Sequence, residues 1–322
     1  HIVADLLLAA EYLPPADQLK DPEGKPLTAR QIPGRGTAYA ILAGVYAWIA
    51  GYGQEPEYYA LGIEAAGKVI GDPNYRLVAS PEEVCTEVLP GNSEEGIFEV
   101  CYDDSRGEYK DFGSYIGGTV EKWPVLKGTT PASRRKFFIR NETVESLYTP
   151  EDLRLQAYFA DFFRMKEEPV SVTQGAAYVR MWREVEYYSG GIYDGTPRTL
   201  LANDILIRLP DILLLRAEMK AATGDREGAV ADLDVVRRRA GVAGYSEAEG
   251  DLRRAIQLER DRELLFQTGV RYFDYMRNHT YNLLKGGFRD LTETDVAAGA
   301  LFLPVSLDAM NNNPKVKQTA YW

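Results

Sequence analysis

The sequence predicts a mostly α (α+β) protein, with helix pairs towards both ends and a loop-rich insertion containing short strands between them. Apolar residues recur at helical spacing in both outer regions of the 322-residue chain. Small residues there occupy the positions at which paired helices would cross. Between about residues 90 and 200, Gly, Pro, Tyr and Phe are frequent and apolar runs are short, a pattern typical of strands joined by loops.

The first helix pair is expected between residues 38 and 70. Apolar residues from Ile41 to Ile49 keep helical spacing, and Thr37 stands where an N-cap is expected. A second apolar series ends at Ile70 and follows the connection GYGQEPE, which predicts an antiparallel pair. The opening HIVADLLLAAEYLPP shows no signal-peptide pattern and looks like a start inside a helix, so we expect a fragment of a longer protein.

The insertion is expected to open with a short helix and to continue as strands and loops. Ser80, Pro81 and Glu83 form a capping-box pattern ahead of Cys85. The segments GIFEVCY, KFFI, AAYVRMW and TLLANDILI are short and β-rich or mixed. Long loops are uncommon in compact domains unless they bind something, which makes this region the expected place for a ligand.

A second helix pair is expected after residue 210. Ala217, Gly224, Ala229 and Leu233 match the small-residue and turn positions of a tetratricopeptide-type pair, and Gly241 follows the cationic helix end RRRAG. We therefore interpret residues 1–322 as a single domain with a helical-repeat part at 1–80, the loop-rich insertion at 81–200, and a second helical-repeat part with a C-terminal segment at 201–322.

Composition excludes several classes of function. A net charge of −11 and the absence of a basic stripe argue against nucleic acid as a partner. The longest apolar segment, AYAILAGVYAWIAGYG, is too short to cross a bilayer. With two Cys and two His and no CxxC spacing, we predict no metal and no cofactor. Cys85 and Cys101 are expected to be two core thiols, with one disulfide as the alternative.

The stretch ERDRELLFQTGVRYFDYMR, residues 259–277, mixes carboxylates, guanidiniums and aromatic rings. A helix from about Leu252 to Gln267 would place Glu259 and Glu263 on one face. Gly269 would permit a corner, and Arg271 and Asp274 beyond it could pair with each other or with the two glutamates. This geometry predicts a structural ion-pair corner.

A glycosidase is the alternative interpretation of the same residues. Two carboxylic acids roughly 5–9.5 Å apart can act as acid and nucleophile. However, an arginine within one turn of each acid favours the ionised form, whereas a general acid needs a raised pKa. We therefore predict no catalytic residues and no enzymatic activity.

The same stretch resembles the motif I-x-x-E-R-x-x-E-L-x-F-E-G-x-R-x-F-D-L-x-R of the SusD/RagB family. The matching positions are Ile256, Glu259, Arg260, Glu263, Leu264, Phe266, Gly269, Arg271, Phe273, Asp274 and Arg277. QTG replaces Glu-Gly and makes the corner one residue longer. GRGTAYAILAGVYAW, NSEEGIFEV, DILIRLPDILLLRAE and FLPVSLDAMNNNPKVKQTAYW resemble further family segments in the same order, with Pro210 in place of the usual alanine.

The resemblance implies a SusD-like fold and a noncatalytic nutrient-binding lipoprotein on the surface of the outer membrane. It implies an oligosaccharide ligand and a SusC-like TonB-dependent transporter that receives it. Membrane attachment would come only through an N-terminal lipid anchor upstream of this chain. The alternatives are a peptide or glycoprotein ligand, or a helical-repeat scaffold that binds only another protein.

Aromatic rings in the insertion are the expected ligand-binding residues, because flat rings stack against sugar faces. The candidates are Tyr109, Phe112, Tyr115, Trp123, Trp182, Tyr187 and Tyr193. The competing interpretation for each ring is burial in the core or under a loop.

Overall fold

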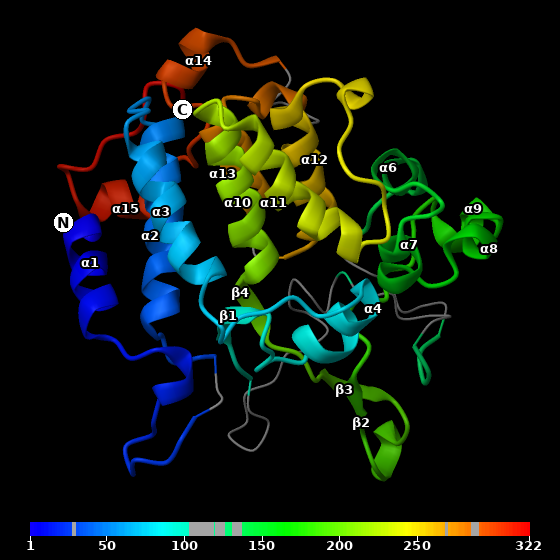
Figure 1. Cartoon of the computed structure of the whole chain (residues 1–322). Helices are drawn as coiled ribbons and strands as arrows, with labels where there is room; N and C mark the ends of the chain where they lie inside the picture. Colours follow the sequence, from blue (N-terminus) through cyan, green and yellow to red (C-terminus); the bar gives the residue numbers. More distant parts are fainter. Residues whose placement is uncertain (28–29, 103–118, 120–125, 131–136, 268–269, 285–289) are drawn as a thin grey trace.

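The structure is a computed structural model, and it describes residues 1–27, 30–102, 119, 126–130, 137–267, 270–284 and 290–322. Within these residues the chain is mostly helical, with two small antiparallel sheets, as the sequence predicts. Figure 1 shows the long helices packed side by side as a bundle, with the strands and short helices of the insertion below and beside them.

The described helices and strands have the following bounds. The longer helices are α1 (Ile2–Tyr12), α2 (Arg35–Gly51), α3 (Tyr58–Ile70), α10 (Leu209–Ala222), α11 (Arg226–Arg239), α12 (Leu252–Glu263) and α13 (Val270–Arg277). The shorter ones are α4 (Pro81–Glu83), α6 (Asn141–Leu147), α7 (Leu153–Tyr158), α8 (Phe162–Lys166), α9 (Val170–Thr173), α14 (Glu293–Ala297) and α15 (Leu307–Asn312). The strands are β1 (Gly96–Val100), β2 (Val185–Tyr187), β3 (Pro197–Leu200) and β4 (Asp204–Arg208).

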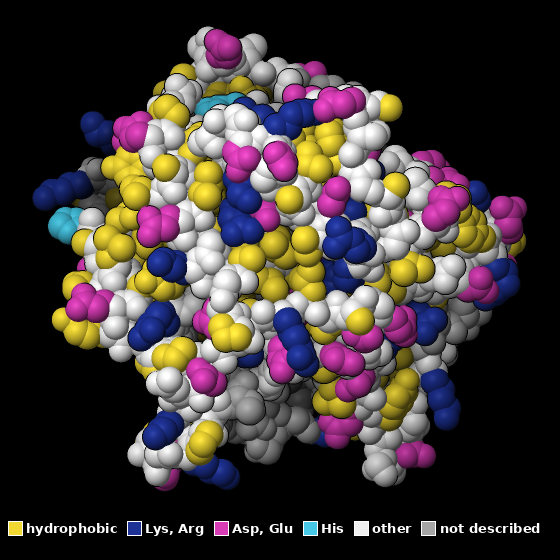
Figure 2. Space-filling view, in the orientation of Figure 1, with side chains coloured by type: hydrophobic (Ala, Val, Ile, Leu, Met, Phe, Trp, Pro, Cys, Tyr) yellow, Lys and Arg dark blue, Asp and Glu magenta, His cyan; other side chains and the backbone are white. Residues whose placement is uncertain are grey.

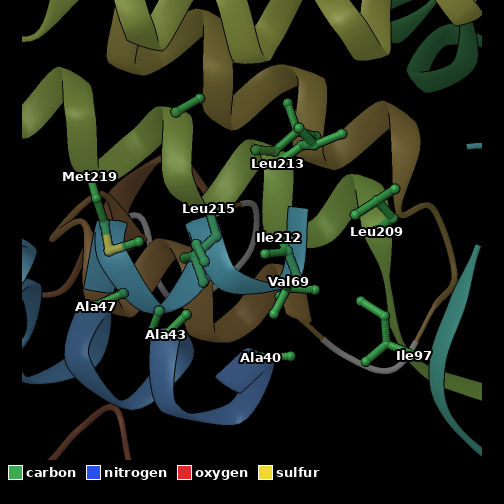
Figure 3. Packing of buried hydrophobic residues seen from close by; sticks show 14 of the residues in the cluster. Ala40, Ala43, Ala47, Val69, Ile97, Leu209, Ile212, Leu213, Leu215 and Met219 are labelled. Atoms are coloured by element: carbon green, nitrogen blue, oxygen red, sulfur yellow. The ribbon is translucent and has the colours of Figure 1, made fainter. Parts of the chain in front are cut away.

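Helix α10 lies at the centre of the bundle and packs against α2, α3, α11 and α12. Its apolar residues enter the main hydrophobic core, where Met219 and Leu215 point towards Ala47 and Ala43 of α2 (Figure 3). A Cβ atom on Gly62 of α3 would lie 2.4 Å from the Met219 sulfur, so this glycine lets the two helices approach closely. A fully buried leucine or methionine side chain stabilises a fold by about 1.5–3 kcal/mol.

The α10–α11 pair has the geometry that its sequence pattern predicts. Ala217 and Ala229 are fully buried where the helices cross. Gly224 takes the positive φ of +87° that ends α10, and Asp225 caps α11 by accepting a hydrogen bond from the Gly228 amide at 2.9 Å. Gly241, with φ +74°, follows the end of α11.

The insertion has a hydrophobic cluster of its own and is tied to the bundle by a strand pair. Its cluster is built around buried rings and aliphatic side chains such as Tyr158, Phe159 and Met181. Strand β1 pairs antiparallel with β4, with Val100 opposite Asp204, and β4 runs directly into α10. The bundle core and the insertion are therefore connected through a short stretch of continuous chain.

Two helix boundaries differ from the sequence prediction. Helix α2 begins at Arg35, so Thr37 is not its N-cap. The Thr37 hydroxyl instead donates to the Ile97 carbonyl at 3.2 Å and so connects the helix to β1. Helix α12 ends at Glu263 and not near Gln267. There the Arg208 guanidinium donates to the Glu263 carbonyl, and Phe266 takes a positive φ of 58°. Gly269, the expected corner residue, lies outside the described residues.

The strand and cysteine predictions are partly corrected. GIFEVCY contains β1, and TLLANDILI overlaps β3 and β4. AAYVRMW forms no strand and makes only isolated bridges at Ala176 and Val179, and within KFFI only residues 137–139 are described and they form no strand. Ser80 caps the short helix ahead of Cys85 as expected, through the Glu83 amide at 3.3 Å. Cys85 is a buried thiol, and burial raises its pKa to about 12, whereas Cys101 is exposed and not in the core.

Candidate functional site

The β2–β3 hairpin presents tyrosine rings to solvent. Three glycines with positive φ, Gly190, Gly191 and Gly195, shape the tip between the two strands. Tyr188 and Tyr193 are 44% and 60% exposed, and their ring centroids lie 5.8 Å apart with planes 41° from parallel. We call these two rings the tyrosine pair.

The hairpin projects from the body of the molecule below β4 in Figure 1. Ile192, at its tip, is 90% exposed. Figure 2 shows that acidic and basic side chains are interspersed over this face of the molecule. The hairpin therefore presents its rings on a protruding element. On the face shown, charges of both signs lie around it.

The other predicted aromatic residues have different surroundings. Tyr187 lies in β2 and is half-buried. Tyr109, Phe112, Tyr115 and Trp123 lie outside the described residues. The structure corrects the prediction for Trp182, which is 3% exposed in the cluster of the insertion and cannot present a ring face to a sugar. The apolar neighbours of Trp182, which come from distant parts of the chain, enclose it.

A small pocket of ≈ 260 Å³ lies at the base of the hairpin. Tyr102, Asn203 and Glu184 are among its lining residues. The Tyr102 hydroxyl donates to the Asp204 carboxylate at 2.7 Å, and this hydrogen bond, with burial, raises the pKa of Tyr102 to about 12. The sequence marks Tyr102 as a candidate ring, but it does not mark Asn203 or Glu184, because separate segments bring them together and no local spacing signals the pocket.

Glu259 and Glu263 lie in a buried network of ion pairs that we call the joint cluster. Its members are Glu95, Asp152, Arg154, Arg208, Arg239, Glu259 and Glu263. Arg154 Nη1 lies 2.7 Å from Glu259 Oε1 and 3.3 Å from Glu263 Oε2, and Arg208 Nη1 lies 2.6 Å from Glu263 Oε1. The cluster connects α12 to α7, α11, β4 and the residue before β1.

Electrostatics in the joint cluster keep Glu263 ionised. Burial by itself would raise the pKa of Glu263, but the guanidiniums of Arg239, Arg208 and Arg154 lower it to about 2. The side chains of Glu259 and Glu263 are both 0% exposed. A carboxylate that holds no proton at neutral pH and touches no solvent cannot protonate a glycosidic oxygen, so this geometry does not support a glycosidase site.

Asp274 and Arg271 form ion pairs with other residues than the sequence predicts. Asp274 is buried between Arg260 and Arg277, at 2.6 Å and 2.7 Å, and Arg277 also forms a bidentate pair with Glu218 of α10. Arg271 pairs with Asp261 at 2.8 Å and not with Asp274 or with either glutamate. The Arg271 side chain is 57% exposed, in contrast to the buried Asp274.

Metal and membrane sites have no support in the part of the chain that the structure describes. No group of three or more His, Cys, Asp or Glu residues there is arranged to hold a metal ion. Among the same residues, none of the helices combines the length and the apolar character that a bilayer span requires.

Comparison with known proteins identifies a family and a fold. The family model described as the SusD family matches residues 94–322. No curated protein matches the chain. Among solved structures, a SusD homologue from Bacteroides thetaiotaomicron is 23% identical with a TM-score of 0.77, over 98% of this chain and 66% of that one.

Two further structures show the same fold. A SusD superfamily protein from Bacteroides fragilis is 16% identical with a TM-score of 0.71, over 98% of this chain and 70% of that one. Surface glycan-binding protein A from B. thetaiotaomicron, solved with laminarihexaose, is 20% identical with a TM-score of 0.70, over 99% of this chain and 69% of that one. The chain spans about two thirds of the length of these proteins.

Proposed function

The chain belongs to the SusD family, and from this premise we propose that it binds an oligosaccharide at the cell surface and delivers it to a TonB-dependent transporter in the outer membrane. SusD family proteins are noncatalytic binding proteins. The observation that carries the saccharide ligand is the exposed tyrosine pair on the projecting hairpin, in a chain whose fold matches a glycan-binding protein solved with laminarihexaose.

The two exposed tyrosine rings suit a saccharide ligand. Sugar rings present flat faces of C–H groups, and aromatic rings stack on such faces. A tyrosine hydroxyl can also form hydrogen bonds with hydroxyl groups at the edge of the sugar ring. Tyr188 and Tyr193 are exposed before any ligand arrives, so binding requires no opening of the core. Their ring planes differ by 41°, which suits neighbouring sugar units of a curved chain better than one flat surface.

A glycan and peptide screen followed by calorimetry tests the proposal. We expect an oligosaccharide among the hits, and we expect Tyr188→Ala and Tyr193→Ala each to weaken its binding by about 10-fold, the worth of one aromatic contact. Tyr12→Ala is the matched control, because Tyr12 is 77% exposed on α1 and far along the chain from the hairpin. Trp123→Ala extends the test to a predicted residue outside the described ranges.

Two outcomes would contradict the saccharide proposal. Hits confined to peptides would assign the ligand to the peptide alternative, and binding only to another protein would favour a helical-repeat scaffold. The surface location and the transporter are proposed from family membership. Antibody labelling of intact cells tests the first, and co-purification of the complete protein with an outer-membrane transporter tests the second.

A further inference from the structure

A cavity of ≈ 730 Å³ lies between the insertion and the last long helices, away from the tyrosine pair. One wall comes from residues 138–147, which include α6, and the opposite wall comes from α12, α13 and the chain between them. Helices α6 and α12 pack against each other beside it. Its volume falls within the range of about 300–1,000 Å³ that is typical of small-molecule pockets.

The lining of this cavity has the opposite charge to the chain. Its ionisable side chains are four arginines and two aspartates, Arg140, Arg254, Arg260, Arg271, Asp261 and Asp274, so its net charge is +2. The chain as a whole carries −11. A cationic concavity on an anionic protein concentrates anions locally, because low-dielectric walls focus the field.

Two of these arginines have no carboxylate partner among the described residues. Arg254 Nη1 lies 2.9 Å from the Gln257 amide oxygen and 3.4 Å from the Tyr275 hydroxyl, both of which are neutral. Arg140 lies with its guanidinium carbon 5.7 Å from the centre of the Phe138 ring. They stand on opposite walls of the cavity, whereas Arg260 and Arg271 are paired with aspartates.

The remaining lining suits a sugar that carries an anionic group. Thr143, Ser146 and Tyr275 bring hydroxyls to the cavity, and Leu258 and Phe266 bring apolar surface. Guanidinium groups bind carboxylates through two parallel hydrogen bonds, which gives both charge and geometric complementarity. Hydroxyls and apolar side chains can then contact the edges and faces of the sugar rings.

We infer that this cavity binds a carboxylate-bearing oligosaccharide, with Arg140 and Arg254 as the side chains that receive the carboxylate. The choice of a saccharide over another carboxylate source rests on the proposed function. This adds a second contact region, whose lining shares no residue with the hairpin, and makes an acidic glycan the preferred ligand class.

Calorimetry with an oligogalacturonate and its carboxyl-reduced, neutral counterpart tests this inference. The two probes share linkage and length and differ in charge. We expect the acidic probe to bind at least about 10-fold more tightly than the neutral one, and we expect Arg254→Ala and Arg140→Ala each to remove about 10-fold of the affinity for the acidic probe. Melting curves should be unchanged, because neither arginine holds an ion pair among the described residues.

Arg253→Ala is the matched control. Arg253 is the neighbour of Arg254 on α12, is exposed, and donates to Asn278 Oδ1 at 3.3 Å outside the cavity lining. Its replacement removes the same charge from the same helix and should leave the affinity for the acidic probe unchanged. Equal losses for Arg253→Ala and Arg254→Ala would reveal non-specific attraction and overturn the inference.

The results with neutral and acidic probes distinguish a failure of this inference from a failure of the proposed function. If neutral oligosaccharides bind at the hairpin but the acidic probe gains nothing, the cavity is a solvent-filled groove and only the inference fails. If a tetra-aspartate peptide binds through Arg140 and Arg254 while no saccharide binds to the chain, the proposed saccharide function fails and the carboxylate belongs to a peptide.

Discussion

The joint cluster and the tyrosine pair are built from polar and aromatic groups in opposite ways. In the joint cluster, carboxylates and guanidiniums from α7, α11, α12 and β4 are fully buried and paired with one another. On the hairpin, two rings that could be buried are held 44% and 60% exposed on a glycine-shaped tip. The first arrangement pairs each carboxylate with at least one guanidinium, and the second leaves ring surface exposed to solvent.

The difference indicates where stability and binding reside. Burying the Glu263 carboxylate carries a desolvation penalty that its three arginine partners offset, so loss of one partner leaves an uncompensated charge in the interior. Removing an exposed ring uncovers little that the fold depends on. Stability and ligand binding should therefore respond to separate sets of substitutions.

The largest effect is expected for Glu263→Gln. Three guanidiniums would lose their shared counter-charge in a fully buried site, so the free energy of unfolding should fall by about 3–5 kcal/mol. Chemical denaturation measures the change. The exposed Glu87→Gln is the control and should leave the midpoint unchanged. An unchanged midpoint for Glu263→Gln would show that the joint cluster does not stabilise the fold.

Acid should remove the same contribution. The pKa of Glu263 is about 2 in the folded protein against an ordinary 4.5, so its stabilising effect is present above about pH 4.5 and is lost as the pH falls through about 2. The difference in unfolding free energy between the parent chain and Glu263→Gln should shrink by about 3 kcal/mol over this window. A difference that stays constant with pH would show that the fold does not lower the pKa of Glu263.

A smaller effect is expected for Arg271→Ala, which sharpens the comparison. Arg271 belongs to the same sequence motif but is 57% exposed, and Asp261 keeps its 2.7 Å hydrogen bond from the Tyr275 hydroxyl. We expect a loss of about 0.5–1 kcal/mol in thermal or chemical unfolding. A loss as large as that of Glu263→Gln would mean that the corner depends on Arg271 after all.

The smallest effect on stability is expected for Tyr193→Ala, which should change the free energy of unfolding by less than about 0.5 kcal/mol. The ring is 60% exposed and contacts Tyr188 on its own hairpin. Differential scanning calorimetry tests this, with Trp182→Ala as the contrast, because the buried Trp182 ring should cost about 3–5 kcal/mol when removed. A strong destabilisation by Tyr193→Ala would assign the hairpin rings to the fold.

Local patterns predicted the helix pairs well. Ala217, Gly224 and Ala229 fix the α10–α11 crossing through residue size and a positive φ, and both properties can be read from the sequence. The end of α12 could not be read in this way. The Arg208 side chain, 55 positions earlier in the chain, satisfies the Glu263 carbonyl there, so the helix stops before the glycine that local reasoning selected.

The candidate sites were less predictable, because they depend on contacts between distant segments. Aromatic content marks Tyr193 as a candidate ligand-binding ring, but it marks Trp182 equally, and only the apolar cluster of the insertion shows that the Trp182 ring is buried. Arg140 and Arg254 are separated by more than a hundred residues, and nothing in the spacing of either predicts that they face one cavity.

One paired measurement tests the central claim that the joint stabilises and the hairpin binds. An oligosaccharide found in the screen is titrated into Glu263→Gln and Tyr193→Ala, and the unfolding midpoint of each variant is recorded in the same buffer. We expect full affinity with a lowered midpoint for Glu263→Gln, and about 10-fold weaker binding with an unchanged midpoint for Tyr193→Ala. The reverse pattern, with binding lost in folded Glu263→Gln and kept in Tyr193→Ala, would contradict it.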